Sequence, residues 1–372
     1  MVERASGEPV MKVTGKSGGV LGAEWGELAG DPVSFEIDTH ATDPLRPDGS
    51  FHVIHRKPDG RLLAEFSGRT TSLYAVDEVA VVTGVIERAE HPDVPLEFVG
   101  KKVAFTVYDG GRHDRIGWVW GFFGAPVNRV QGTAPTFPLS WGDFTVKGGP
   151  GQQPESPRAG STPKGNRSNA PLITQPTGTP DGTAGTPDGT AGTPDRTAGS
   201  PDGTFSAPDG TFSAPDGTPG APRVTIASGS DGGRQRGTSV RAVLGGTSKA
   251  PAFRGDPLRF SLAARIAPGG NAKEVTGGFH VMHHKPDGSV VADFEGKITC
   301  LTVGGKVGVA TGVVTRSAAP ELVGKPVSFS LKDGRMDRLG WLWGFSATDE
   351  PIVDCQSTVP FYAPDWGGLT VR

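Results

Sequence analysis

The sequence lacks the features typical of membrane-spanning, nucleic-acid-binding and helical proteins. No apolar run approaches the roughly 18 residues of a membrane-spanning helix, so no transmembrane segment is expected. No basic run is present and the formal net charge is −3, which argues against a nucleic-acid partner. Cysteine is scarce, at two residues in 372. No stretch has a convincing helical period, which excludes a bundle of long helices.

Motifs for nucleotide binding and for serine hydrolysis are missing as well. The G-K-S at Gly15–Ser17 lacks the earlier glycine of a phosphate-binding loop, because Val10 stands at that position. No G-x-S-x-G turn and no Ser/His/Asp order stands out. The sequence therefore points to no catalytic residue, no cofactor and no metal, and an enzyme is the less favoured class.

Glycine and proline are abundant, at 57 and 33 residues. Glycine weakens helices and proline breaks them, so this composition favours short strands joined by turns. Met1–Gly19 has neither the basic start nor the apolar stretch of a signal peptide, which weighs against Sec export.

The sequence contains two copies of the same pattern. D-G-G-R-H-D-R-I-G-W-V-W-G-F at Asp109–Phe122 recurs as D-G-R-M-D-R-L-G-W-L-W-G-F at Asp333–Phe345. F-H-V-I-H-R-K-P-D-G at Phe51–Gly60 recurs as F-H-V-M-H-H-K-P-D-G at Phe279–Gly288. The chain is therefore a tandem duplication of one module.

The duplication divides the chain into three parts. Module 1 is expected at residues 10–147 and module 2 at residues 223–372. Residues 148–222 carry a seven-residue repeat, such as T-P-D-G-T-A-G at Thr179–Gly185 and S-P-D-G-T-F-S at Ser200–Ser206. Because every unit contains proline and glycine, no helix or sheet can propagate there. We expect a disordered tether that lets the two modules move independently.

Within the modules apolar residues alternate with a period of two, as at Val103, Phe105 and Val107. Turn signals such as P-D-G separate these runs, which favours antiparallel hairpins. Strands are expected near residues 33–39, 51–57, 61–66, 70–76, 79–86 and 116–122, with a final strand at 143–147 and 369–372. Each module is predicted to be an all-β antiparallel barrel or sandwich of about eight strands.

The repeated W-x-W step places pairs of tryptophans on one strand face: Trp118 and Trp120 in module 1, Trp341 and Trp343 in module 2. These rings could form an aromatic platform that binds sugar rings or another flat ligand. They could instead fill the core, with the intervening glycines admitting a neighbouring backbone. Ile116 and Phe122 continue the same face, which favours the core.

Paired histidines also recur in both copies: His52 and His55 in module 1, His280 and His283 in module 2. Two residues three positions apart point to opposite faces of a strand, so neither pair can chelate one metal ion. His55 and His283 fall on the apolar face, where we expect them to line the core or a cavity.

Acidic and basic residues cluster at corresponding positions of the two copies: Asp109, Asp114 and Arg115, and then Asp333, Asp337 and Arg338. Paired carboxylates could act in acid–base chemistry. The favoured interpretation is structural, with Asp109 and Asp333 shaping turns and each Asp-Arg step forming an ion pair. Calcium binding is disfavoured, since the spacing matches no defined loop.

Both cysteines, Cys300 and Cys355, lie in module 2. Alignment of the copies puts Ser72 opposite Cys300 and Gln131 opposite Cys355. Two cysteines that are present together in one copy and absent together from the other are expected to form a disulfide. The alternative is two unrelated buried thiols. A disulfide would imply an oxidising compartment.

Several of these runs resemble a family of small actinobacterial proteins, generally secreted and often labelled repetin. The resemblance rests on F-H-V…K-P-D-G, on T-C-L-T-V-G-G-K-V-G-V-A-T-G-V-V-T at Thr299–Thr315, on D-R-L-G-W-L-W-G and on Cys355. It covers both modules but not the tether. It implies a β-rich exported module with Cys300 bonded to Cys355 and no established activity. This chain departs from the family in having two copies and in lacking both cysteines in the first.

We therefore expect a non-catalytic binding or structural protein whose modules recognise a cell-envelope polysaccharide or another extracellular component. Two weak sites on one chain would reinforce each other through avidity. The alternative is a small-molecule barrel, either a carrier or an isomerase-like or cyclase-like enzyme, with His55 and His283 beside the ligand. The expected location is extracellular or at the cell surface, with the cytoplasm as the alternative.

Overall fold

The computed structural model describes residues 10–92, 94–149, 151, 237–346 and 350–372. The expected tether at 148–222 lies almost entirely outside these residues. Within the described ranges, no helix has the length and apolar character needed to cross a bilayer.

Module 1 is one sheet of nine strands. These are β1 (Met11–Val20), β2 (Pro32–Ala41), β3 (Asp48–Arg56), β4 (Leu62–Val76), β5 (Val79–Glu90), β6 (Lys102–Tyr108), β7 (Arg115–Trp120), β8 (Phe137–Pro138) and β9 (Trp141–Lys147). Two short 3-10 helices, η1 (Ala23–Leu28) and η2 (Gly121–Phe123), join strands at its rim.

Module 2 is a sheet of eight strands. These are β10 (Ser239–Thr247), β11 (Pro257–Ile266), β12 (Val275–His284), β13 (Val290–Gly304), β14 (Val307–Ser317), β15 (Pro326–Lys332), β16 (Arg338–Trp343) and β17 (Trp366–Val371). The 3-10 helices η3 (Pro251–Phe253) and η4 (Pro320–Leu322) lie in its connections.

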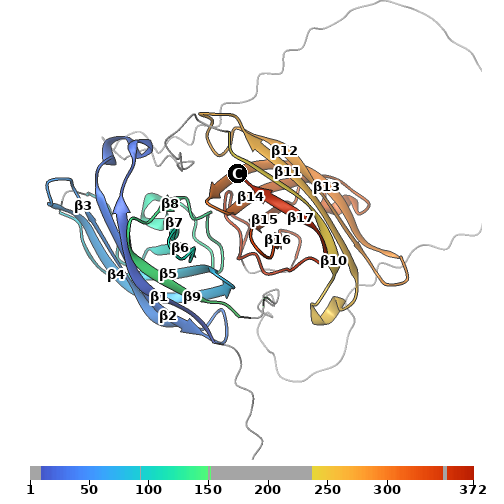
Figure 1. The fold of residues 1–372 in the computed structure, drawn as a ribbon, viewed down its shortest axis with the longest axis horizontal. Helices are drawn as coiled ribbons and strands as arrows, with labels where there is room; N and C mark the ends of the chain where they lie inside the picture. Colours follow the sequence, from blue (N-terminus) through green and yellow to red (C-terminus); the bar gives the residue numbers. More distant parts are fainter. Residues whose placement is uncertain (1–9, 93, 150, 152–236, 347–349) are drawn as a thin grey trace, which may run out of the picture. The chain divides into compact units, whose positions relative to one another are not determined.

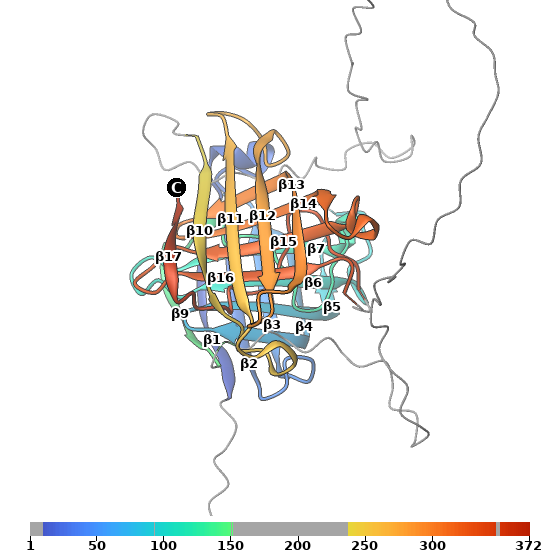
Figure 2. The ribbon, with the colours of Figure 1, turned by 90° about the vertical axis from the view of Figure 1, so that its right-hand side faces the viewer.

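The two sheets share one antiparallel topology (Figure 1). In module 1 the order is β8-β7-β6-β5-β4-β3-β2-β1-β9, and in module 2 it is β16-β15-β14-β13-β12-β11-β10-β17. The last strand of each module therefore pairs with the first, while every other strand pairs with its neighbour in the chain. Figure 2 shows β10, β11 and β12 side by side in this way. The prediction of two antiparallel all-β modules is confirmed.

The period of two places the core on the concave side of each sheet. Along β2, Val33, Phe35 and Ile37 are buried while the residues between them are exposed or half-buried. Phe51 and Phe105 are also buried, and their ring centroids lie 5.3 Å apart. Each such ring contributes roughly 1.5–3 kcal/mol by leaving water, so these aromatic side chains dominate the core.

The strands depart from the prediction most clearly at β4, β7 and β1. The runs 61–66 and 70–76 belong to one continuous strand, β4, which contains irregular steps at Ser67/Gly68 and Thr70/Ser72. Strand β7 ends at Trp120, and Phe122 belongs to the 3-10 helix η2. Strand β1 was not predicted, because its three glycines and weak alternation hide it.

Candidate functional site

The module 1 tryptophans lie on the inner face of the sheet and belong to a stacked row of rings. Trp118 stacks on Trp120 with centroids 5.8 Å apart, and Trp25 of η1 stacks on Trp118 at 5.2 Å. Trp118 also contacts Phe35 of the core at 5.0 Å. Trp118 and Trp120 are half-buried. They extend the aromatic core to the rim instead of forming a separate platform on the outer surface.

Module 2 has the same row without the covering tryptophan. Trp341 stacks on Trp343 at 5.9 Å, and Trp343 stacks on Phe345 at 5.9 Å. Trp341 is 6% exposed and contacts Phe260 of the core at 4.8 Å. The arrangement is therefore a repeated structural feature of the module.

A histidine and a carboxylate pair at the same place in both modules. His55 Nε2 lies 2.7 Å from Asp31 Oδ2, and His283 Nε2 lies 2.7 Å from Asp256 Oδ2. Burial lowers the pKa of His55, and the hydrogen bond and charge of Asp31 oppose that effect only in part. Each pair joins the start of one strand to the end of the next, which is a structural tie as well as a potential acid–base pair.

The other two histidines lie on the opposite face of their strands, as the spacing predicts. His52 Nε2 lies 2.8 Å from Glu65 Oε1, and His280 Nε2 lies 2.7 Å from Asp293 Oδ1. All four partners are partly exposed. In the described part of the chain, no group of three or more His, Cys, Asp or Glu residues could hold a metal ion.

The clustered aspartates hold the last strand of each module. Asp114 Oδ2 accepts a hydrogen bond from Phe144 N of β9 at 2.8 Å, and Asp109 Oδ2 accepts one from Val146 N at 3.1 Å. Burial raises the pKa of Asp114, and the Phe144 N–H opposes this rise. These two carboxylates satisfy backbone donors on the edge of β9 that β1 does not reach.

The same clamp recurs in module 2. Asp337 Oδ2 accepts a hydrogen bond from Leu369 N of β17 at 2.8 Å, and Asp333 Oδ2 accepts one from Val371 N at 3.0 Å. The cluster is thus a device for closing the sheet, a role that the sequence did not indicate. The signal was a D-G step followed by a second aspartate, D-G-G-R-H-D in module 1 and D-G-R-M-D in module 2, together with a short final strand in each copy.

The arginines of the cluster reach the loop that returns toward the last strand. Arg115 Nε donates to Pro135 O at 3.0 Å, and Arg338 Nη1 donates to Phe361 O at 3.2 Å. The predicted ion pair of Arg338 with its neighbour Asp337 is wrong, because Arg338 pairs with Asp77. Asp337 precedes β16 and its carboxylate accepts hydrogen bonds from the backbone of Gly334 and Leu369 instead.

The sulfur atoms of Cys300 and Cys355 lie at bonding distance, and their Cα atoms are 5.3 Å apart. The alignment across the copies needs a correction of one residue. Cys355 has a φ of 61°, and the residue with the matching left-handed backbone in module 1 is Val130, at 54°, not Gln131. Val130 N donates to Ser72 Oγ at 3.0 Å, where module 2 has its sulfur–sulfur contact. Ser72 therefore corresponds to Cys300, as predicted.

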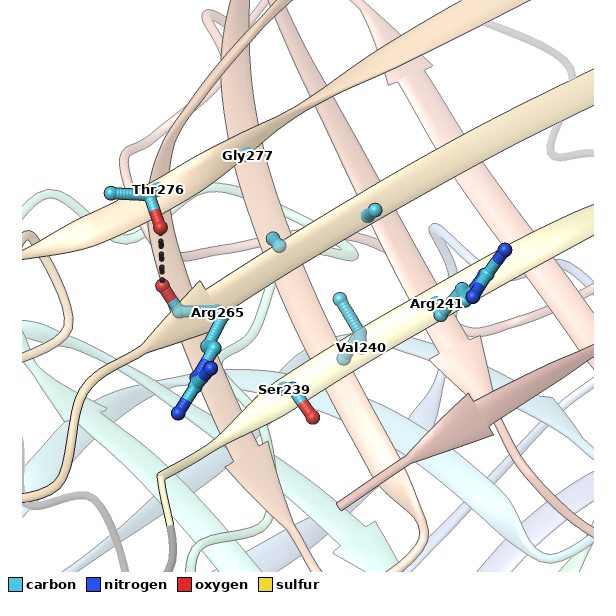
Figure 3. Close-up of a pocket in the computed structure, with 8 residues that line it drawn as sticks. Ser239, Val240, Arg241, Arg265, Thr276 and Gly277 are labelled. Carbon is cyan, nitrogen blue, oxygen red and sulfur yellow. Dashed lines mark hydrogen bonds between the residues drawn. The ribbon is translucent and has the colours of Figure 1, made fainter.

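Two hollows lie on the described part of the chain, and neither is lined by tryptophan or histidine. Figure 3 shows one of them, over strands β10, β11 and β12, where Arg241 and Arg265 extend from neighbouring strands. Thr276 Oγ1 donates to Arg265 O at 3.4 Å beside this hollow.

An exposed tryptophan at the start of each final strand was missed by the sequence interpretation. Trp141 of β9 and Trp366 of β17 are each 47% exposed. The indole of Trp141 lies against Gly18, where a Cβ would come within 2.4 Å of the ring, and Trp366 lies against Gly245 in the same way. The signal was W-G in S-W-G-D-F and D-W-G-G-L, which recurs at corresponding positions.

A comparison with known protein families, curated proteins and solved structures finds no match to this chain.

Proposed function

We propose that this protein is a non-catalytic binding protein that recognises an extracellular or cell-envelope polysaccharide through Trp141 and Trp366. The observation that carries the proposal is the repeated seat of these two rings. Each indole lies on a glycine of the first strand and keeps about half of its surface in solvent. The glycine lets a large ring lie close to the strand, and the exposed part of that ring is available to stack on the apolar face of a sugar ring.

The filled interior supports surface recognition over an enclosed ligand. Phe35, Phe105 and Phe329 are fully buried in the concave sides of the sheets. The alternative, a small-molecule barrel, has the repeated His55–Asp31 and His283–Asp256 pairs in its favour. A histidine beside a carboxylate suits acid–base chemistry only where a substrate can reach it.

The repetition has a consequence for affinity. A single exposed indole that becomes buried contributes the kind of energy seen at interface hot spots, about 2 kcal/mol or thirtyfold. Two such sites on one chain reinforce each other when the target repeats, as a polysaccharide does.

The test is binding of the full chain to a glycan array and to insoluble cell-envelope polysaccharide. We expect Trp141→Ala and Trp366→Ala each to weaken binding about tenfold or more, and the double variant to abolish it. Phe253→Ala is the matched control, since Phe253 is 46% exposed but lies on His283 instead of a glycine. Unchanged binding by a folded double variant, or no binding of the wild type to any polysaccharide, contradicts the proposal.

A further inference from the structure

Two loops with the same pattern bind each other. P-V-N-R-V-Q-G-T-A-P at residues 126–135 precedes the end of module 1, and P-I-V-D-C-Q-S-T-V-P at residues 351–360 precedes the end of module 2. We call them the glutamine loops. Gly132 N donates to Ser357 O at 2.9 Å, and Ser357 N donates to Gly132 O at 2.9 Å. The structure therefore joins modules that the sequence predicted to move independently, and both belong to one compact unit.

The glutamines make the same contact in both directions. Gln131 Nε2 donates to Pro351 O at 3.0 Å, and Gln356 Nε2 donates to Pro126 O at 3.0 Å. Both glutamines are 4% exposed. Corresponding residues that contact each other reciprocally are the mark of a two-fold symmetric interface. The two modules thus pair as the subunits of a homodimer would.

The symmetry fails at one end of this interface, where charges gather. Lys332 Nζ lies 2.6 Å from Glu78 Oε1 and 3.4 Å from Asp77 Oδ2. Arg338 donates through Nη2 to Asp77 Oδ1 at 3.0 Å, and its Nε also pairs with Asp77. Lys332 is only 3% exposed, and a lysine is almost never buried without a partner. We call these four residues the charge cluster.

At the other end of the interface, the residues at the corresponding positions of the two modules carry different charges. The β13–β14 turn has Gly305 and Lys306 where the β4–β5 turn has Asp77 and Glu78. A Cβ on Gly305 would lie 2.8 Å from Arg115 Cδ and 3.9 Å from a ring atom of Tyr108. Lys306 turns to a carboxylate of its own module, with Nζ 3.2 Å from Asp333 Oδ2.

The backbone at Asp77 gives independent support. Asp77 has a φ of 49°, and the glycine at the corresponding position, Gly305, has a φ of 60°. A left-handed conformation is unfavourable for an aspartate and not for a glycine. The carboxylate held there contacts Lys332 and Arg338, both of module 2. An outlier of this kind points to a function for the residue.

We propose that modules 1 and 2 form a heterotypic pair, and that the charge cluster determines its specificity by preventing module 2 from pairing with itself. In a module 2 pair of this geometry, Lys332 and Arg338 would face Gly305 and Lys306. Lys332 and Arg338 would then lose both of their acidic partners and meet Lys306, which already has Asp333 as its partner. Like charges that face each other in an interface disfavour the wrong partner.

Self-pairing of module 1 is disfavoured less strongly. Asp77 and Glu78 would face Tyr108 and Arg115, which offer one positive charge for two negative ones. The heterotypic pair alone matches two acids with two cations. This inference concerns pairing within the chain and does not depend on what the protein recognises.

The experiment uses the full chain with a specific protease site inserted in residues 152–236. After cleavage, native mass spectrometry and size-exclusion chromatography at serial dilutions give the stoichiometry and the dissociation constant. The wild type is expected to remain a complex of one module 1 with one module 2. K332E is expected to weaken this complex about thirtyfold or more, because a buried acid then faces Asp77 and Glu78.

A compensating variant makes the test specific. D77N/E78K/K332E restores an opposite-charge pair between positions 78 and 332, and its affinity is expected within about tenfold of the wild type. K16E/E36K exchanges an exposed pair elsewhere in module 1 and should change nothing. If K332E does not fold, D77N/E78Q tests the same contacts from module 1. Separation of the cleaved wild type, self-pairing of its module 2, or a folded triple variant without recovery overturns the proposal.

Discussion

The two modules hold the same strained residue by different chemistry. Val130 and Cys355 both adopt a left-handed backbone immediately before the glutamine that crosses to the other module. In module 1 the N–H of Val130 is held by the Ser72 hydroxyl at 3.0 Å, and in module 2 Cys355 is tied to Cys300. Valine is a poor residue for this conformation, so the conformation itself is required. We conclude that contact between the modules requires this loop conformation. Module 1 stabilises it through Ser72 of β4, and module 2 stabilises it through Cys300 of β13.

The largest effect is expected when module 2 is given the residues of module 1. C300S/C355V replaces the covalent tie across 55 residues by the hydroxyl–amide contact of module 1. Loss of such a tie costs about 2–4 kcal/mol, of which a new hydrogen bond returns about 1 kcal/mol. Denaturant unfolding of C300S/C355V should therefore show lower stability than the wild type. C300A/C355V, which lacks the hydroxyl, should be less stable still, and equal stability of the two variants contradicts the equivalence.

The next largest effect is expected at Asp114 and Asp337, the carboxylates that hold the last strand of each module. Asp114 is 5% exposed and accepts hydrogen bonds from Phe144 N at 2.8 Å and Gly110 N at 3.0 Å. Asp337 accepts from Leu369 N at 2.8 Å but is partly exposed, so water can replace its carboxylate. We expect Asp114→Ala to lower the unfolding free energy by about 2–3 kcal/mol and Asp337→Ala by about half of that.

Thermal and denaturant unfolding of both variants measures this difference. Hydrogen exchange at β9 and β17 locates it, because the released strand should lose protection in the variant module only. Asp59→Ala serves as the control, since Asp59 lies in an exposed turn. A larger loss at Asp337 than at Asp114 would contradict the role assigned to burial.

The sequence predicted the sheet well because strand periodicity and turn chemistry are local. Alternation along β2, at Val33, Phe35 and Ile37, and the P-D-G turns hold in the structure. The run at Val103, Phe105 and Val107 does form a strand, but β6 is buried on both faces. Strand β1 escaped because Gly18 and Gly19 resemble a loop. Their side chains are absent because Trp141 and Phe137 occupy the space, and those residues lie far along the chain.

The site and the pairing of the modules depend on contacts that no local pattern reveals. Nothing near Gln131 indicates that its amide meets a carbonyl 220 residues away. The alignment of Gln131 with Cys355 was wrong by one residue. The two copies differ in length before this loop, and the sequence does not show that Val130 and Cys355 share a left-handed backbone. The predicted final strand began at residue 143 and assigned no role to Trp141, whose contact with Gly18 is visible only in the structure.

A smaller effect tests whether Ser72 and Cys300 are interchangeable. Ser72→Ala removes the acceptor of the Val130 N–H and a 2.6 Å contact with Thr83 Oγ1. We expect a loss of about 1–2 kcal/mol in the unfolding free energy. S72C/V130C should instead form a disulfide in module 1, which mass spectrometry under alkylation with and without reductant detects. Two free thiols in the folded variant would show that the positions do not correspond.

The smallest effect is a difference in pH dependence that involves His55. Burial holds the pKa of His55 below its ordinary value of 6.5, although Asp31 partly opposes this. A histidine with a lowered pKa stays neutral in the folded chain while the unfolded chain takes up a proton. Stability must then fall as the pH decreases below 6.5, and it rises again with increasing pH.

The matched variant is His55→Gln, whose amide can still bond Asp31 but cannot titrate. Chemical denaturation at a series of pH values between about 5 and 8 should give a steeper loss of stability on acidification for the wild type. Carboxylates common to both chains cancel in this difference, because they contribute the same slope to each. A wild-type slope that equals the His55→Gln slope means that Asp31 offsets the burial of His55 completely, and the histidine is then only a structural tie.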